Sequence, residues 1–199
     1  MDIFVNAQPL TCSWVTGEMT MREVIARILP DVEREGRALM EVTIDGDTFD
    51  PSDDDSLATR RVDAVKRVDL LVQTHDEILS NALQDGPEIL LHLETKALEG
   101  ANELRVGKVR EGMQHLVDVL DGMEWLSTIL EHLDYSGKGL EENALALKKT
   151  ELLKQIETQM TNLHASQEQQ DWVGVADILE YEIQERFREG AELFRQVKG

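Results

Sequence analysis

The sequence predicts an α+β protein, in which a small domain that contains strands precedes an all-α antiparallel bundle of about four helices. Two patterns support this prediction. All four prolines lie in the first 87 of the 199 residues, and the rest of the chain has none, as long helices require. Alternating aliphatic residues, typical of half-buried strands, are also confined to the first part. The chain therefore changes character between Val72 and Pro87.

The composition is that of a globular and strongly acidic protein. Hydrophobic residues make up 41% of the chain, charged residues make up 30%, and the net charge is −20. Such a surface repels nucleic acid and anionic membranes and favours a basic protein partner. A solvated acidic surface with no specific partner gives the same composition. No apolar stretch approaches the roughly 18 residues that span a membrane. From this and from the acidic charge, we expect neither membrane nor nucleic-acid binding.

The N-terminus and the cysteine content bear on location. The first ten residues have neither the basic start nor the apolar run of a signal peptide. Cys12 is the only cysteine, so the chain cannot form an internal disulfide. Both observations favour a cytoplasmic protein.

The first strands are expected to form a hairpin. Residues 3–5 are a short β-rich run, and residues 6–9 supply turn formers. Leu10, Cys12 and Trp14 then alternate with Thr11 and Ser13, which is the pattern of a half-buried second strand.

A helix and three strands complete the expected first domain. Thr20 and Glu23 have the spacing of a capping box, and an apolar helical face follows them. Pro30 is expected to end or bend this helix, although Val32 continues the same face. Residues 40–44 alternate as a strand that enters a turn. A short strand from Thr48 and a last strand over residues 68–72 follow.

In element order, element spacing and length, residues 1–74 resemble a ubiquitin-like (β-grasp) domain. The resemblance implies a small recognition module whose sheet face or sheet edge binds partners. Conjugating members of that family end in Gly-Gly, whereas this chain reads Val72-Gln73-Thr74 and continues, so conjugation is not implied. A ferredoxin-like or other α+β arrangement is the alternative.

Residues 75–199 are expected to form the bundle. Short connections between long helices favour antiparallel neighbours. The expected helical segments are residues 78–83, which end at Asp85-Gly86-Pro87; residues 87–100; residues 106–133; residues 140–163, after a break at 135–139; and residues 171–194, with Asp171 as N-cap.

The segment at 106–133 is expected to be the central helix. Its apolar residues recur in steps of three and four, and further apolar residues widen this stripe beyond a narrow seam. A helix this apolar needs cover from several neighbours. The stripe consists of Val109, Met113, Leu116, Leu120, Met123 and Leu130, widened by Val106, Val117, Val119, Leu126, Ile129 and Leu133.

No motif in the sequence indicates catalysis, a cofactor or a metal. None of the five histidines lies in the Glu-x-x-His motif of di-iron bundles, and Glu88/His92 and Glu111/His115 are more simply surface pairs. The acidic run at residues 45–55 lacks the order of an EF-hand, and Asp53 or Ser52 as a helix cap explains part of it. Phosphate-binding loops and a nucleophile elbow are missing.

The candidate contact residues are Trp172, Glu180, Tyr181 and Glu182. Trp172 shares the apolar face of the last helix, whereas Tyr181 points away from it between two glutamates. An outward tyrosine flanked by carboxylates suits a basic or amphipathic partner helix. Packing of Tyr181 against a neighbouring element is the simpler alternative.

These observations favour a non-catalytic interaction, adaptor or assembly protein that binds another protein through its bundle or its sheet. One alternative is a bacterial secretion or flagellar-type export chaperone, because such proteins are often small, acidic and helical. The other is a metal-binding helical bundle or enzyme that uses helix carboxylates with His92 or His115. A homo-oligomer with paired apolar strips is a further possibility.

Overall fold

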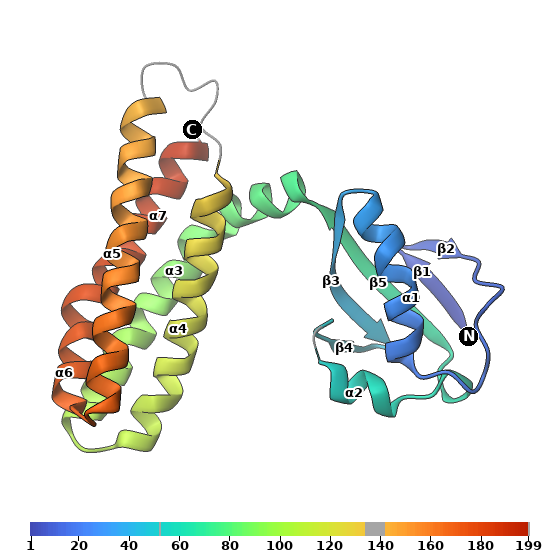
Figure 1. Cartoon of the computed structure of the whole chain (residues 1–199), viewed down its shortest axis with the longest axis horizontal. Coiled ribbons are helices and arrows are strands. Elements are labelled where there is room, and N and C mark those ends of the chain that lie inside the picture. Colours follow the sequence, from blue (N-terminus) through green and yellow to red (C-terminus); the bar gives the residue numbers. More distant parts are fainter. Residues whose placement is uncertain (52, 134–141, 199) are drawn as a thin grey trace. The chain divides into compact units, whose positions relative to one another are not determined.

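The structure is a computed structural model that describes residues 1–51, 53–133 and 142–198. Its contacts divide the chain into two compact units, Met1–Ile78 and Leu79–Gly199. The first holds a five-stranded mixed sheet, and the second is helical (Figure 1). The predicted α+β class is therefore confirmed. We call the two parts the sheet unit and the helical unit.

The sheet has the strand order β2-β1-β5-β3-β4. The central strand, β5, is parallel to its neighbour β1, and the other neighbours are antiparallel. The strands are β1 (Asp2–Val5), β2 (Gln8–Leu10), β3 (Arg37–Ile44), β4 (Asp47–Phe49) and β5 (Arg67–Thr74).

The predicted hairpin exists, but its second strand was placed too late in the sequence. Asn6 and Ala7 both have positive φ angles, 48° and 62°, so a two-residue turn pairs Val5 directly with Gln8. Strand β2 therefore ends at Leu10. Cys12 and Trp14 lie beyond it and pack, partly buried, against the core of the sheet unit.

Helix α1 (Met21–Arg34) begins with the predicted capping box between Thr20 and Glu23. Pro30 lies inside this helix and does not end it. A proline removes one backbone hydrogen bond, but Ile28 and Val32 on either side are buried and hold the helix against the sheet. Burial of the apolar face thus outweighs the lost bond.

Hydrogen bonds from backbone N–H groups account for two members of the acidic run after β3, Asp45 and Asp53. The Asp45 carboxylate accepts hydrogen bonds from the backbone N–H groups of Lys66 and Arg67, at 2.8 to 3.2 Å. Asp53 caps the short helix α2 (Asp54–Thr59) by accepting from the Ser56 N–H. The 3₁₀ turn η1 (Val62–Ala64) then leads into β5.

In the described part of the helical unit there are four helical rods (Figure 1), and they are antiparallel in succession, as predicted. The last rod is continuous but contains a π-helical segment, η3. The rods are α3 (His75–Arg105), α4 (Val109–His132), α5 (Glu142–Glu168), and the series α6 (Trp172–Asp177), η3 (Ile178–Ile183) and α7 (Gln184–Lys198).

The predicted break at Asp85-Gly86-Pro87 is wrong, because α3 runs through it. Gly86 and Pro87 are buried, and a Cβ atom on Gly86 would lie 2.7 Å from the Phe194 ring. The glycine therefore makes room for an aromatic ring of α7 instead of ending a helix. The expected break at residues 135–139 lies outside the described residues.

Helix α4 packs against α3, α5 and α7, which gives it the cover from several neighbours that its apolar stripe predicts. Nothing in the described residues singles it out as central, and its buried face is narrower than predicted. Val106 precedes the helix and is 71% exposed, and Val117 is 54% exposed. Two glycines let α4 approach α3 closely, Gly112 against Leu104 and Gly122 against Leu93. The fully buried face of α4 consists of Leu116, Val119, Met123, Leu126 and Leu130.

Within the described ranges, no helix has the length and apolar character needed to cross a membrane.

Candidate protein-binding site

The two aromatic contact candidates differ in burial, as the helical periodicity predicted. Trp172 begins α6 and packs, half-buried, against the core of the helical unit. Asp171 caps this helix as predicted, since it accepts a hydrogen bond from the Gly174 N–H at 3.0 Å. Tyr181 lies in η3 and is 63% exposed. It points outward as expected, so Tyr181 is the more accessible of the two aromatic side chains.

Arg105, near the end of α3, occupies part of the Tyr181 surface. Its guanidinium lies 5.7 Å from the centre of the Tyr181 ring. It donates a hydrogen bond to Asp177 at 2.7 Å and another to Glu180. These bonds, to Asp177 first, raise the pKa of Arg105 above its usual range. The Glu180 carboxylate is thus engaged within the chain, which leaves the Tyr181 ring and Glu182 for a partner.

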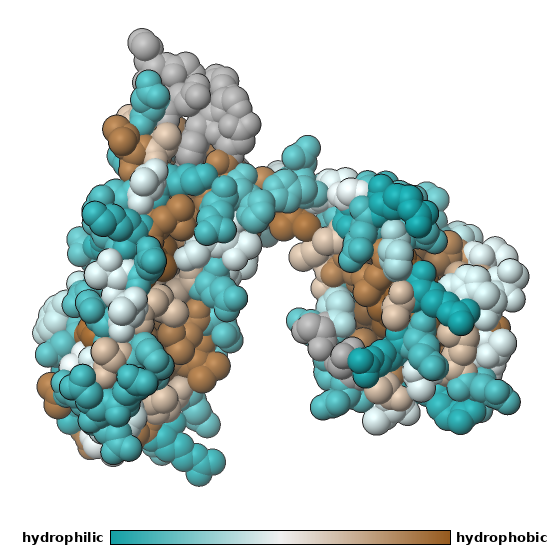
Figure 2. All heavy atoms as spheres, viewed as in Figure 1, coloured by the Kyte–Doolittle hydropathy of each residue, from teal (hydrophilic) through white to brown (hydrophobic). Residues whose placement is uncertain are grey.

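A larger surface feature lies between α4 and α5. We call it the α4–α5 groove, and it encloses about 720 Å³. Figure 2 shows apolar side chains gathered along the boundary between these helices. The apolar floor consists of Leu120, Met123, Leu153, Ile156 and Met160; the rim consists of Asp121, Glu124, Glu131, Lys154 and Glu157; Ser127 also lines the groove.

The rim of the α4–α5 groove is acidic and not neutralised. Among the residues that the structure describes, none of its four carboxylates forms an ion pair. Elsewhere on the bundle such pairs are common, for example Asp118 with Lys96, Asp177 with Arg105 and Glu94 with Arg188. An apolar floor between uncompensated charges is characteristic of a surface that a partner covers.

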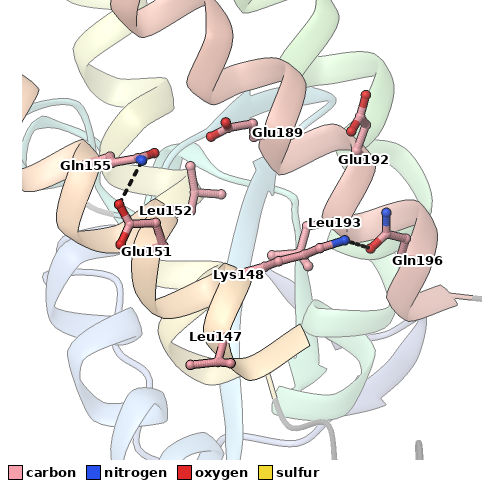
Figure 3. Close-up of a pocket in the computed structure, with 9 residues that line it drawn as sticks. All are labelled: Leu147, Lys148, Glu151, Leu152, Gln155, Glu189, Glu192, Leu193 and Gln196. Carbon is pink, nitrogen blue, oxygen red and sulfur yellow. Dashed lines mark hydrogen bonds between the residues drawn. The ribbon is translucent and has the colours of Figure 1, made fainter. Parts of the chain in front are cut away.

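A second pocket, of about 430 Å³, lies between α5 and α7. Figure 3 shows Glu189 and Glu192 on α7 and Glu151 on α5 around it, with Lys148 reaching Gln196 at 2.9 Å. We call it the α5–α7 pocket. Its apolar lining is provided by Leu147, Leu152 and Leu193.

A buried arginine lies beside the α5–α7 pocket. The Arg186 side chain is 8% exposed, donates a hydrogen bond to Gln155 and lies 3.2 Å from Glu189. Its Nε and the buried Oε1 of Gln159 have no hydrogen-bond partner in the described part of the chain. Arg186 is therefore paired with carboxylates of its own helix, Glu185 and Glu189, and does not present a free cation to a ligand.

Burial raises the pKa of Glu189, and the positive charge of Arg186 only partly opposes this. A carboxyl whose pKa is higher in the folded than in the unfolded chain destabilises the fold once it ionises. We therefore expect Glu189 to lower the free energy of unfolding as the pH rises from its pKa in the unfolded chain to its higher pKa in the folded chain. Glu189→Gln should remove this contribution, which urea unfolding midpoints from about pH 4 to about pH 7 would measure. An unchanged pH profile would contradict the assignment.

The histidines do not gather into a metal site. His115 lies 3.5 Å from Glu103 and 3.9 Å from Glu99, both on α3. Its ion-pair partners are therefore these two residues and not Glu111, the partner that the spacing predicted. Across residues 1–51, 53–133 and 142–198, no group of three or more His, Cys, Asp or Glu side chains has the geometry to hold an ion. The described part offers no support for the metal-binding alternative.

Sequence reasoning missed the α4–α5 groove because it assigned both Leu120 and Met123 to the buried stripe of residues 106–133. Only Met123 of these two is fully buried. A signal was present in the spacing of Asp121, Glu124 and Glu131, which places three carboxylates along one edge of the apolar stripe. The neighbouring helix that turns this edge into a groove could not be deduced from the spacing.

Comparisons with known families cover most of the chain. Residues 1–74 match the TP0873 N-terminal domain, and residues 81–192 match a domain of unknown function, DUF8042. The families found do not include a ubiquitin-like one. No curated protein and no solved structure matches the chain. The match at 81–192 contains the α4–α5 groove and spans more than half of the chain. By this match, the chain belongs to the DUF8042 family.

Proposed function

We propose that the protein is a non-catalytic adaptor or assembly protein that binds another protein through the α4–α5 groove. The observation that carries the proposal is the combination of an apolar floor with four carboxylates that have no ion-pair partner among the described residues. Binding of a partner would remove the floor from water and compensate the rim. An export chaperone that holds an amphipathic client segment is one form of this function.

The Tyr181 surface is a second and smaller candidate. Its aromatic ring is well exposed, which suits a contact residue. However, Arg105 already covers part of the ring and engages Glu180. A partner there would have to compete with an existing intramolecular contact, whereas the α4–α5 groove has no such competitor among the described residues.

We also propose that the sheet unit is a β-grasp domain. The order β2-β1-β5-β3-β4, with β1 parallel to the central strand β5 and α1 between β2 and β3, supports this assignment. A ferredoxin-like domain starts with strand, helix, strand, whereas this chain starts with two consecutive strands. In an adaptor, such a unit would supply a second contact surface.

The proposal predicts that Leu120→Arg abolishes partner capture. Leu120 is half-buried in the groove floor, so arginine would place a charge where a partner packs. Wild-type and variant protein would be used to capture partners from extract of the source cells, with quantitative mass spectrometry. We expect at least one protein to be enriched by the wild type and lost with the variant.

Leu147→Arg is the matched control, because Leu147 lines the α5–α7 pocket and is 72% exposed. It introduces the same side chain and charge outside the groove. Circular dichroism would verify that both variants fold. If Leu120→Arg does not fold, Met160→Gln is the milder change in the groove floor that replaces it. Identical partner sets for groove variant, control and wild type would reject the proposed function.

A further inference from the structure

We infer that the partner segment is a basic amphipathic helix of about three turns, laid along the α4–α5 groove. This inference rests on the proposed function and adds the chemistry of the partner. It follows from the length of the groove, from the kind of residues on its floor and from the distribution of charge on its rim.

The dimensions of the groove suit a helix. Its lining on α4 extends from Leu120 to Glu131, which corresponds to about three helical turns. Apolar side chains of an amphipathic helix recur on one face at this spacing and would meet the floor together. Met160, which is only partly buried, contributes an unbranched, polarizable side chain that adjusts to irregular partners. The floor is therefore adaptable and continuous over the length of a short helix.

The rim selects the charge of that helix. It carries four carboxylates and one lysine, and the chain as a whole has a net charge of −20. Lysine and arginine side chains that flank an apolar stripe would reach these carboxylates, whereas acidic residues would be repelled. Because the same repulsion acts between copies of this acidic chain, a basic partner fits better than a second copy.

The charge distribution also orients the partner. The α4 edge of the groove carries Asp121, Glu124 and Glu131, whereas the α5 edge has Lys154 beside Glu157. The more basic side of the docked helix should therefore face α4. Removal of charge from Glu124 and Glu131 should weaken binding without altering the apolar floor.

The test uses the full chain and three labelled peptides of about 14 residues. The first is an amphipathic leucine–lysine helix, the second has the same residues scrambled so that no apolar face forms, and the third has glutamate in place of lysine. Fluorescence anisotropy would measure affinity at several salt concentrations. We expect the first peptide to bind about tenfold or more tightly than the scrambled one, and no binding of the acidic one.

A charge-matched pair of variants separates the groove from general attraction. Glu124→Gln with Glu131→Gln should weaken the basic helix severalfold and reduce its salt dependence. Glu151→Gln with Glu192→Gln removes the same charge from the α5–α7 pocket and should leave binding unchanged. Equal binding of the scrambled peptide, or equal effects of the two double variants, would overturn the inference.

The two proposals can fail separately. If a cellular partner is lost with Leu120→Arg but the basic helix does not bind, the proposed function stands and the partner chemistry is wrong. If capture is insensitive to Leu120→Arg, the proposed function is wrong.

Discussion

Phe194→Ala is expected to lower the free energy of unfolding of the helical unit by about 3–5 kcal/mol. The Phe194 side chain is fully buried. Its ring meets the Trp125 ring edge-on, with centres 6.0 Å apart, and fills the space left by the missing side chain of Gly86. Truncation would leave a cavity between α3, α4 and α7 that the surrounding backbone cannot close.

Guanidinium unfolding followed by far-ultraviolet circular dichroism would measure this loss. Val173→Ala is the control, because Val173 is 60% exposed on α6 and its truncation creates no cavity. We expect the control to change the free energy of unfolding by less than about 0.5 kcal/mol. A Phe194 variant as stable as the control would show that the ring is not packed as described.

Gly112→Val is the second change with a large expected effect, a loss of about 3 kcal/mol. A Cβ atom at Gly112 would lie 2.6 Å from Cγ of Leu104 and 3.1 Å from the backbone oxygen of Gly100. Leu104 is buried and the Gly100 oxygen belongs to a helix backbone, so neither can move without separating α3 from α4. The better helix propensity of valine recovers only part of this cost.

Ala144→Val on α5 is a suitable control, because it introduces the same β-branched side chain into a helix at an exposed position. We expect a small decrease in stability there, from helix propensity alone. Differential scanning calorimetry of both variants would compare their melting temperatures. A Gly112 variant that melts with the control would mean that α3 and α4 are not in close contact at this point.

The features that the sequence predicted correctly are mostly local ones. Thr20 with Glu23, and Asp171 with the Gly174 N–H, are caps whose partners lie three residues away. The apolar periodicity of α4 and α5 depends in the same way on spacing along one helix. Such features require no knowledge of neighbouring elements, so spacing is enough to identify them.

The incorrect predictions share a different origin. Pro30 was expected to end or bend its helix and Gly86 to end one, because of their intrinsic preferences, but burial against the sheet and against Phe194 keeps both helices continuous. Trp14 alternates like a strand residue, yet the tight turn at Asn6 and Ala7 ends the pairing before it. In each case a contact distant in sequence, or a particular turn geometry, decided the outcome.

The candidate site shows the same division. The outward direction of Tyr181 followed from helical periodicity, and the structure agrees. That Arg105 would lie against it, 76 positions earlier in the chain, could not be inferred. The α4–α5 groove likewise exists only because two helices lie side by side, so it cannot be predicted from the sequence of either helix alone.

The π-helical segment η3 has a consequence for how this family can vary. Each residue of a helix advances the chain by about 100° around its axis. Because η3 lies within a continuous rod, one residue gained or lost there would rotate α7 and carry Phe187 and Phe194 out of the core. The length of the segment from Trp172 to Phe194 should thus be invariant among homologues that share this fold, and length changes should collect outside the rods.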